Sequence, residues 1–141
     1  MKKLLACVLT AVLMLSCNTA CDIFEKDTGY DPSLKCERYT NYAVFTFENF
    51  PVRGTATFKL ERTCLGEGAI YYQVNLKQGA LGISYKDSVW SEHQSLGNFS
   101  ADDKMPINGS GGYVEGSKIE ISFGALSPVI GEIIISFVPI E

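Results

Sequence analysis

The sequence predicts an all-β fold, a small antiparallel β-sandwich or barrel of about seven strands behind a signal peptide and a flexible tether. Three observations support this prediction. From Asn41 onward, apolar and polar residues alternate with a period of two, which is typical of strands with one buried face. Glycine-rich turn segments separate these stretches at short intervals. Beyond Asn41, no stretch shows the spacing of an amphipathic helix.

The chain begins as an export signal does. Lys2 and Lys3 precede an uncharged run from Leu4 to Leu15. A membrane-spanning helix needs about 20 apolar residues, so this run is too short to remain in a bilayer as one. A positive start, a short apolar middle and small residues at the end are typical of a signal peptide that is removed. We therefore expect residues 1–16 to be a signal peptide.

The apolar run ends in the tetrapeptide MLSC, residues 14–17. This tetrapeptide resembles the lipobox of bacterial lipoproteins, in which an apolar residue and a small residue precede a cysteine that receives lipid. The resemblance implies that Cys17 is the lipid attachment site and that the protein is a lipoprotein. Acylation of Cys21, and ordinary cleavage after Ala20 with plain secretion, are the alternatives.

Residues 17–38 are expected to carry the lipid and to form a tether, with a β-domain at residues 39–141. The tether is polar and has no sustained period. Its early acidic residues resemble the surface-export signals of Bacteroidota lipoproteins; they are Asp22, Glu25 and Asp27. Two or three acyl chains, each contributing about 0.8 kcal/mol per buried methylene, hold a protein at a bilayer. The expected location is the outer membrane, facing either the periplasm or the cell surface.

The overall charge argues against nucleic acid as a partner. The chain has 12 Lys and Arg against 16 Asp and Glu, a formal net charge of −4 at pH 7. Loss of Lys2 and Lys3 with the signal would make the protein more negative still. Because nucleic acids and anionic lipid head groups are also negative, we expect membrane attachment through covalent lipid alone.

The cysteines predict one disulfide bond. The cell envelope is oxidising, so thiols there tend to pair. Removal of Cys7 with the signal and acylation of Cys17 would leave Cys21, Cys36 and Cys64. The last two flank predicted strands, and we expect a bridge between them that contributes roughly 3–4 kcal/mol in the chain-entropy model. If Cys21 carried the lipid instead, the remaining thiols would form this one pair.

The alternating segments define the predicted strands in order. They are NYAVFTFE (41–48), TATFKLE (55–61), AIYYQVNLK (69–77), LGISYK (81–86), KIEISF (118–123) and GEIIISFV (131–138). The last segment is apolar on both faces, which favours a central place in the sheet. Gln78 and Gly79 separate two runs, which predicts a tight hairpin with positive φ at Gly79. CLGEGA and NGSGG are predicted to be glycine loops, and GALSPVIG to link the last two strands.

No catalytic signature rises above chance, so we do not expect an enzyme. Ser91, Glu92 and His93 are adjacent, and neighbours in a strand point to opposite faces rather than to one substrate atom. Asp102 and Asp103 are adjacent in a loop, whereas glycosidase carboxylates face each other across a cleft. The one histidine has no ligands at zinc-site spacing around it, so no metal or other cofactor is expected.

Three aromatic residues outside the predicted core are candidates for partner binding. Tyr71 falls on the polar side of its strand, Trp90 in an irregular segment and Tyr113 in a glycine loop. Exposed aromatic rings stack on sugars and anchor protein partners. The leading hypothesis is therefore a lipid-anchored, non-enzymatic binding or accessory module for a protein or glycan. A structural subunit of an envelope assembly, or a small hydrolase or hydrolase inhibitor, is the alternative.

Overall fold

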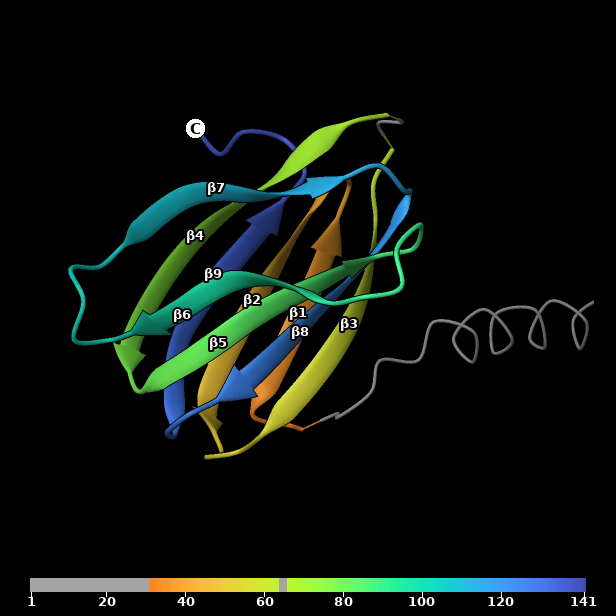
Figure 1. The fold of residues 1–141 in the computed structure, drawn as a ribbon. Helices are drawn as coiled ribbons and strands as arrows, with labels where there is room; N and C mark the ends of the chain where they lie inside the picture. Colours follow the sequence, from red (N-terminus) through yellow and green to blue (C-terminus); the bar gives the residue numbers. More distant parts are fainter. Residues whose placement is uncertain (1–30, 64–65) are drawn as a thin grey trace, which may run out of the picture.

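The computed structural model describes residues 31–63 and 66–141, which form two antiparallel sheets packed face to face (Figure 1). The strands of these residues are β1 (Leu34–Tyr39), β2 (Tyr42–Phe50), β3 (Thr55–Glu61), β4 (Gly68–Gln78), β5 (Ala80–Asp87), β6 (Gln94–Ser100), β7 (Ile107–Val114), β8 (Lys118–Ala125) and β9 (Val129–Ser136). One sheet has the order β1-β2-β9-β4-β7 and the other β3-β8-β5-β6. Within the described ranges there is no helix, and hence none long and apolar enough to cross a membrane.

The predicted fold class is confirmed, and the fold is a sandwich. Each alternating segment forms most of a strand, and TATFKLE coincides with β3, whereas Asn41 precedes β2 and Phe137 and Val138 follow β9. The predicted hairpin at Gln78 and Gly79 is wrong, because β4 and β5 belong to different sheets and do not pair. Gly79 does have the predicted positive φ, 85°, but its turn carries the chain from one sheet to the other. The doubly apolar segment lies in β9, which pairs with β2 on one side and β4 on the other, so its predicted central position is also confirmed.

Three strands were not predicted, and one of them corrects a predicted loop. The NGSGG segment belongs to β7 rather than to a loop, because its glycines let the strand lie directly over two large rings. A Cβ atom at Gly109 would lie 2.5 Å from the Tyr72 ring, and one at Gly112 would lie 2.8 Å from the Tyr85 ring. The strands β1 and β6 were the other omissions.

The folded domain begins earlier than residue 39. β1 pairs with β2 along its whole length, from Leu34 opposite Phe47 to Tyr39 opposite Tyr42. Leu34 is buried in the core and secures the start of the strand. The last residues of the predicted tether are therefore part of the sandwich.

Several predictions concern residues outside the described ranges. These are the signal peptide at residues 1–16, lipid attachment at Cys17 and the alternative at Cys21. The expected bridge also involves such a residue, since Cys64 lies outside the described ranges. Its expected partner Cys36 lies in β1, partly buried against the core.

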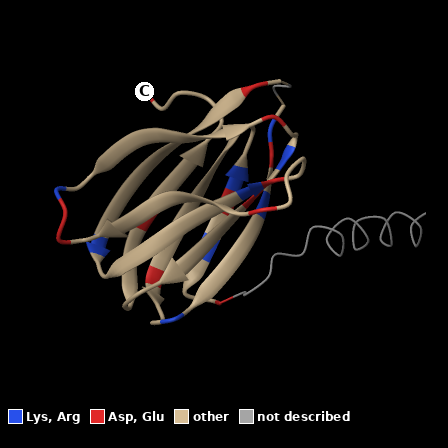
Figure 2. Cartoon of the chain, in the orientation of Figure 1, with Lys and Arg blue, Asp and Glu red and all other residues tan. Residues whose placement is uncertain are grey.

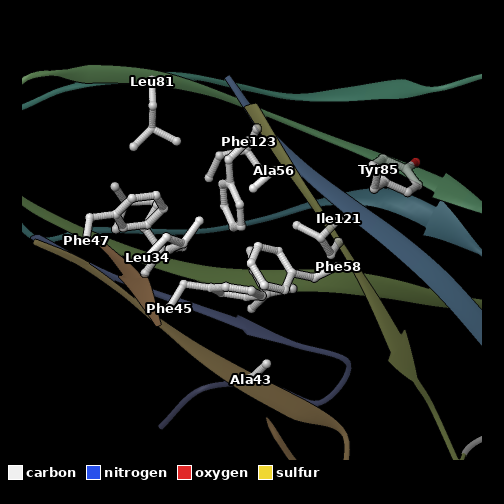
Figure 3. Close-up of a cluster of buried hydrophobic side chains, with 14 of the residues drawn as sticks. Leu34, Ala43, Phe45, Phe47, Ala56, Phe58, Leu81, Tyr85, Ile121 and Phe123 are labelled. Atoms are coloured by element: carbon white, nitrogen blue, oxygen red, sulfur yellow. The ribbon is translucent and has the colours of Figure 1, made fainter. Parts of the chain in front are cut away.

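The core is built around a cluster of phenylalanine rings that joins the two sheets (Figure 3). Phe123 of β8 contacts Phe45 and Phe47 of β2, with ring centroids 4.7 and 5.3 Å apart. Phe58 of β3 packs edge-on against Phe45 at 5.0 Å. Edge-to-face contact is a favoured geometry for aromatic pairs, and these contacts hold the two sheets against each other.

Candidate functional site

The structure brings two of the three candidate aromatic residues together. Trp90 follows the end of β5, and Tyr113 lies in β7. Their rings are stacked, with centroids 5.7 Å apart and planes 11° apart. Trp90 is partly buried against the core, whereas Tyr113 is 40% exposed. The two rings therefore stack on one another and join the segment after β5 to β7.

Tyr71 lies elsewhere. Its neighbours in β4, Ile70 and Tyr72, face the core, so Tyr71 faces outward from the five-stranded sheet. The Trp90 ring instead borders a pocket over the four-stranded sheet. The three candidates thus divide into a stacked pair and one separate residue.

Hydrogen bonds fix the orientation of Tyr113. The Tyr85 hydroxyl accepts a hydrogen bond from the Tyr113 backbone N–H at 3.0 Å and lies 3.3 Å from the Tyr113 carbonyl oxygen. The Tyr113 hydroxyl donates to the Glu115 carboxylate. That bond, partial burial and the nearby Glu67 carboxylate raise the pKa of Tyr113, so the phenol stays neutral at physiological pH.

A buried carboxylate organises the backbone that carries both rings. Asp87 is fully buried at the end of β5. Its oxygens accept hydrogen bonds from the backbone N–H groups of Glu115 at 2.6 Å, Gly116 at 3.0 Å and Val89 at 3.1 Å. Its carbonyl oxygen accepts from the Trp90 N–H at 3.0 Å. Asp87 therefore ties the segment of Trp90 to the turn after Tyr113.

Arg62 supports this arrangement from the other side. Its guanidinium is buried and donates to the carbonyl oxygens of Gly116 at 3.2 Å and Gly66 at 2.8 Å. Burial opposes ionisation of Asp87, but the backbone hydrogen bonds and the charge of Arg62 outweigh it and lower the pKa of Asp87. The carboxylate is therefore charged at neutral pH.

Trp90 forms one wall of a pocket of about 250 Å³ whose lining combines apolar surface with charged side chains. The rest of the lining comes from the outer face of the four-stranded sheet and includes Ser88, Lys59, Lys86, Lys118 and Glu120. Typical small-molecule sites enclose roughly 300–1,000 Å³. This pocket is smaller and open, so it suits one unit of an extended ligand.

A second stacked pair was missed by sequence reasoning. Tyr39 and Tyr42 face each other across the turn between β1 and β2, with centroids 4.6 Å apart and planes 10° apart. They line a pocket of about 200 Å³ together with Arg38 and Lys59. The available signal was the sequence YTNY, in which Asn41 adopts a φ of 65° between two tyrosines.

The residues weighed for catalysis are at the surface. Ser91, Glu92 and His93 are exposed in the loop before β6. Asp102 and Asp103 are exposed in the loop after β6, where Asp103 accepts a hydrogen bond from the backbone N–H of Ser100 at 3.1 Å. In the described part of the chain, no three His, Cys, Asp or Glu side chains are grouped closely enough to hold a metal ion.

Comparisons with known proteins return only distant structural likenesses. No family model matches the chain, and no curated protein matches it. A variant of the family 29 carbohydrate-binding module CBM29-2 shares 13% identity over 79% of this chain and 77% of its own, with a TM-score of 0.44. A variant of Xylanase10C from Cellvibrio japonicus in complex with xylopentaose shares 13% identity over 77% of this chain and 24% of its own, with a TM-score of 0.42. Similarity this low indicates nothing about the ligand of this chain.

Proposed function

We propose that this protein is a non-enzymatic glycan-binding module whose binding platform is the Trp90–Tyr113 pair. The observation that carries the proposal is the stacked pair beside a pocket lined by both apolar surface and charged side chains. A sugar ring has an apolar face of C–H groups and a rim of hydroxyls. Aromatic rings match the face, while the Ser88 hydroxyl, lysine ammonium groups and Glu120 carboxylate match the hydroxyls.

The size and composition of the pocket favour a glycan over a protein partner. Protein interfaces usually have a broad apolar centre that is depleted of charged residues. The pocket beside Trp90 is instead small and has charged side chains and the Ser88 hydroxyl next to its apolar surface. This composition is that of a small-molecule or oligosaccharide site, in which a few polar groups orient the ligand.

Replacing Trp90 by alanine tests this function. The detergent-solubilised full-length chain is titrated by calorimetry with soluble neutral and acidic polysaccharides: hydroxyethyl cellulose, xylan, galactomannan and polygalacturonate. Trp90→Ala is expected to weaken binding at least about tenfold, because buried aromatic anchors commonly contribute about 2 kcal/mol or more.

Tyr71→Ala is the matched control, since it removes an aromatic side chain from the outer face of the other sheet. Its affinity for the same polymers should equal that of the unchanged protein. A loss with Tyr71→Ala as large as that with Trp90→Ala, or no binding of any polymer by the unchanged protein, would refute the platform.

We further propose that lipid on Cys17 holds the module at the outer membrane. The support is the MLSC tetrapeptide after a short apolar run. Cys17→Ala should abolish incorporation of radiolabelled palmitate and release the protein from the membrane fraction. Cys21→Ala serves as the control and should leave labelling intact; the reverse result would move the lipid to Cys21.

A further inference from the structure

The pocket beside Trp90 has a local charge opposite to that of the chain. The whole chain has a formal net charge of −4. The pocket lining nevertheless brings together Lys59, Lys86 and Lys118 against the carboxylate of Glu120. The other lining carboxylate, Asp87, is buried and accepts its hydrogen bonds from the backbone. The solvent-facing side of the pocket is therefore basic.

The strand register places three of these charges in a row, whereas Lys118 lies two residues before Glu120 in β8, opposite Glu61 of β3. Glu120 of β8 lies opposite Lys59 of β3 on one side and Lys86 of β5 on the other. Neighbouring strands are about 4.8 Å apart, so the two lysine backbones are roughly 10 Å apart. Glu120 reduces the repulsion between them, since opposite charges across strands attract. Figure 2 shows basic positions on neighbouring strands at this end of the sheet.

The ammonium groups of Lys86 and Lys118 are available to a ligand. Within the described residues, neither has a carboxylate within 4.0 Å, whereas Lys35 pairs with Glu48 at 2.6 Å. Each ammonium group offers three hydrogen-bond donors and no acceptor. Such donors bind carboxylate or sulfate oxygens more strongly than neutral hydroxyls, because charge-assisted hydrogen bonds are roughly twice as strong.

The basic row connects the two aromatic pairs. Lys59 lines both the pocket beside Trp90 and the pocket beside Tyr39 and Tyr42. Arg38 also lines the second pocket and donates through Nε to the Lys59 carbonyl oxygen at 3.3 Å. The two pockets therefore adjoin at Lys59, with an aromatic stack beside each, and Glu61 adds one carboxylate to the second.

We infer that the glycan bound at Trp90 is an extended anionic polysaccharide, with carboxylate or sulfate groups, that runs over the lysine row to the Tyr39–Tyr42 stack. This inference rests on the proposed glycan-binding function and names its ligand class. Each pocket is too small to enclose an oligosaccharide, so a ligand that occupies both is an extended chain. The basic row lies where it meets the acidic groups of such a chain.

Two pairs of polymers test whether binding requires negative charge. Within each pair the sugar backbone is the same and only the charge differs. Polygalacturonate is compared with its fully methyl-esterified form, and dextran sulfate with dextran, by calorimetric titration of the solubilised full-length chain. At least one polyanion should bind about tenfold or more tightly than its neutral counterpart at 0.01 M salt. The preference should shrink at 0.1 M salt, because the Debye length falls from about 30 Å to about 10 Å.

Substitutions then locate the charge effect. Lys86→Ala and Lys118→Ala should each weaken binding of the preferred polyanion about three- to tenfold and leave binding of its neutral counterpart unchanged. Glu120→Gln should strengthen polyanion binding about two- to threefold, since it removes a like charge from the row. Lys77→Ala is the control, because Lys77 is exposed on the other sheet and should have no effect.

The outcomes separate this inference from the proposed function. Equal affinity for charged and neutral polymers, with both lost in Trp90→Ala, would overturn the anionic ligand and leave the glycan platform standing. A loss with Lys77→Ala equal to that with Lys86→Ala would overturn the lysine row as the site. Binding to phosphatidylglycerol vesicles with no polysaccharide binding would overturn both.

Discussion

Replacing Asp87 by alanine is expected to lower the free energy of unfolding by about 3–5 kcal/mol. The carboxylate is fully buried and accepts hydrogen bonds from three backbone N–H groups, those of Val89, Glu115 and Gly116. Its removal leaves these donors unsatisfied and leaves the buried guanidinium of Arg62 without a countercharge. Equilibrium denaturation in urea, read as a change in midpoint at constant slope, measures the loss.

Asp103→Ala is the control for this substitution. Asp103 also accepts a backbone hydrogen bond, from Ser100 at 3.1 Å, but it is exposed in a loop. Water replaces the lost bond there, so the cost should stay within about 1 kcal/mol. Equal losses for the two substitutions would show that the buried network around Asp87 contributes no special stability.

The pH dependence of this effect has a defined sign. The pKa of Asp87 in the folded protein is below its usual 3.8, because the backbone hydrogen bonds and Arg62 outweigh the opposing effect of burial. A lowered pKa in the folded state contributes stability above the unfolded pKa, and this contribution disappears as pH falls through the folded pKa. The stability difference between the native chain and Asp87→Asn should therefore be constant from pH 5 to 7 and shrink below about pH 4.

The same network links stability to the site. The Asp87 carbonyl oxygen accepts a hydrogen bond from the Trp90 N–H, and the Asp87 carboxylate accepts one from the Glu115 N–H. The Glu115 carboxylate in turn accepts a hydrogen bond from the Tyr113 hydroxyl. The stacked rings are therefore positioned by one buried acid through its backbone hydrogen bonds. Loss of that acid would allow the two segments to move apart even in molecules that remain folded.

The alternating strands could be predicted because their side-chain period is visible in the chain itself. β3, for example, places Ala56, Phe58 and Leu60 in the core and keeps the residues between them outside. β7 has no such signal, since its glycines leave the core space to the rings of Tyr72 and Tyr85 from other strands. The apolar partner of a glycine strand is contributed by distant sequence, which no local pattern reveals.

The candidate site was predictable only in part, for a related reason. The residue types of Trp90 and Tyr113 marked them as candidates, but their stacking depends on the pairing of β4 with β7 and on Asp87. The lysine row depends on the register of three strands that are far apart in the chain. Sequence patterns indicate which residues face outward, whereas register decides which of them become neighbours.

Replacing Phe123 by alanine is expected to lower the free energy of unfolding by about 3–5 kcal/mol. The ring is 2% exposed and contacts Phe45 and Phe47 of the opposite sheet and Phe58 of the neighbouring strand. The substitution removes the favourable free energy of burying the ring. It also leaves a cavity that the other three rings cannot fill, because backbone hydrogen bonds within the two sheets fix the strands that carry them. Thermal and urea denaturation measure the effect.

Two further substitutions show whether the cost comes from the shared ring contacts. Phe123→Leu keeps most of the volume and should cost less than half as much as alanine, since the remaining loss is the edge-to-face geometry with Phe45 and Phe47. Leu126→Ala, at a side chain that is 65% exposed, should change stability by less than about 0.5 kcal/mol. If Phe123→Ala cost no more than Leu126→Ala, the phenylalanine cluster would not be what joins the two sheets. The buried hydrogen-bond network of Asp87 would then be the remaining contact that fixes the position of the Trp90 platform.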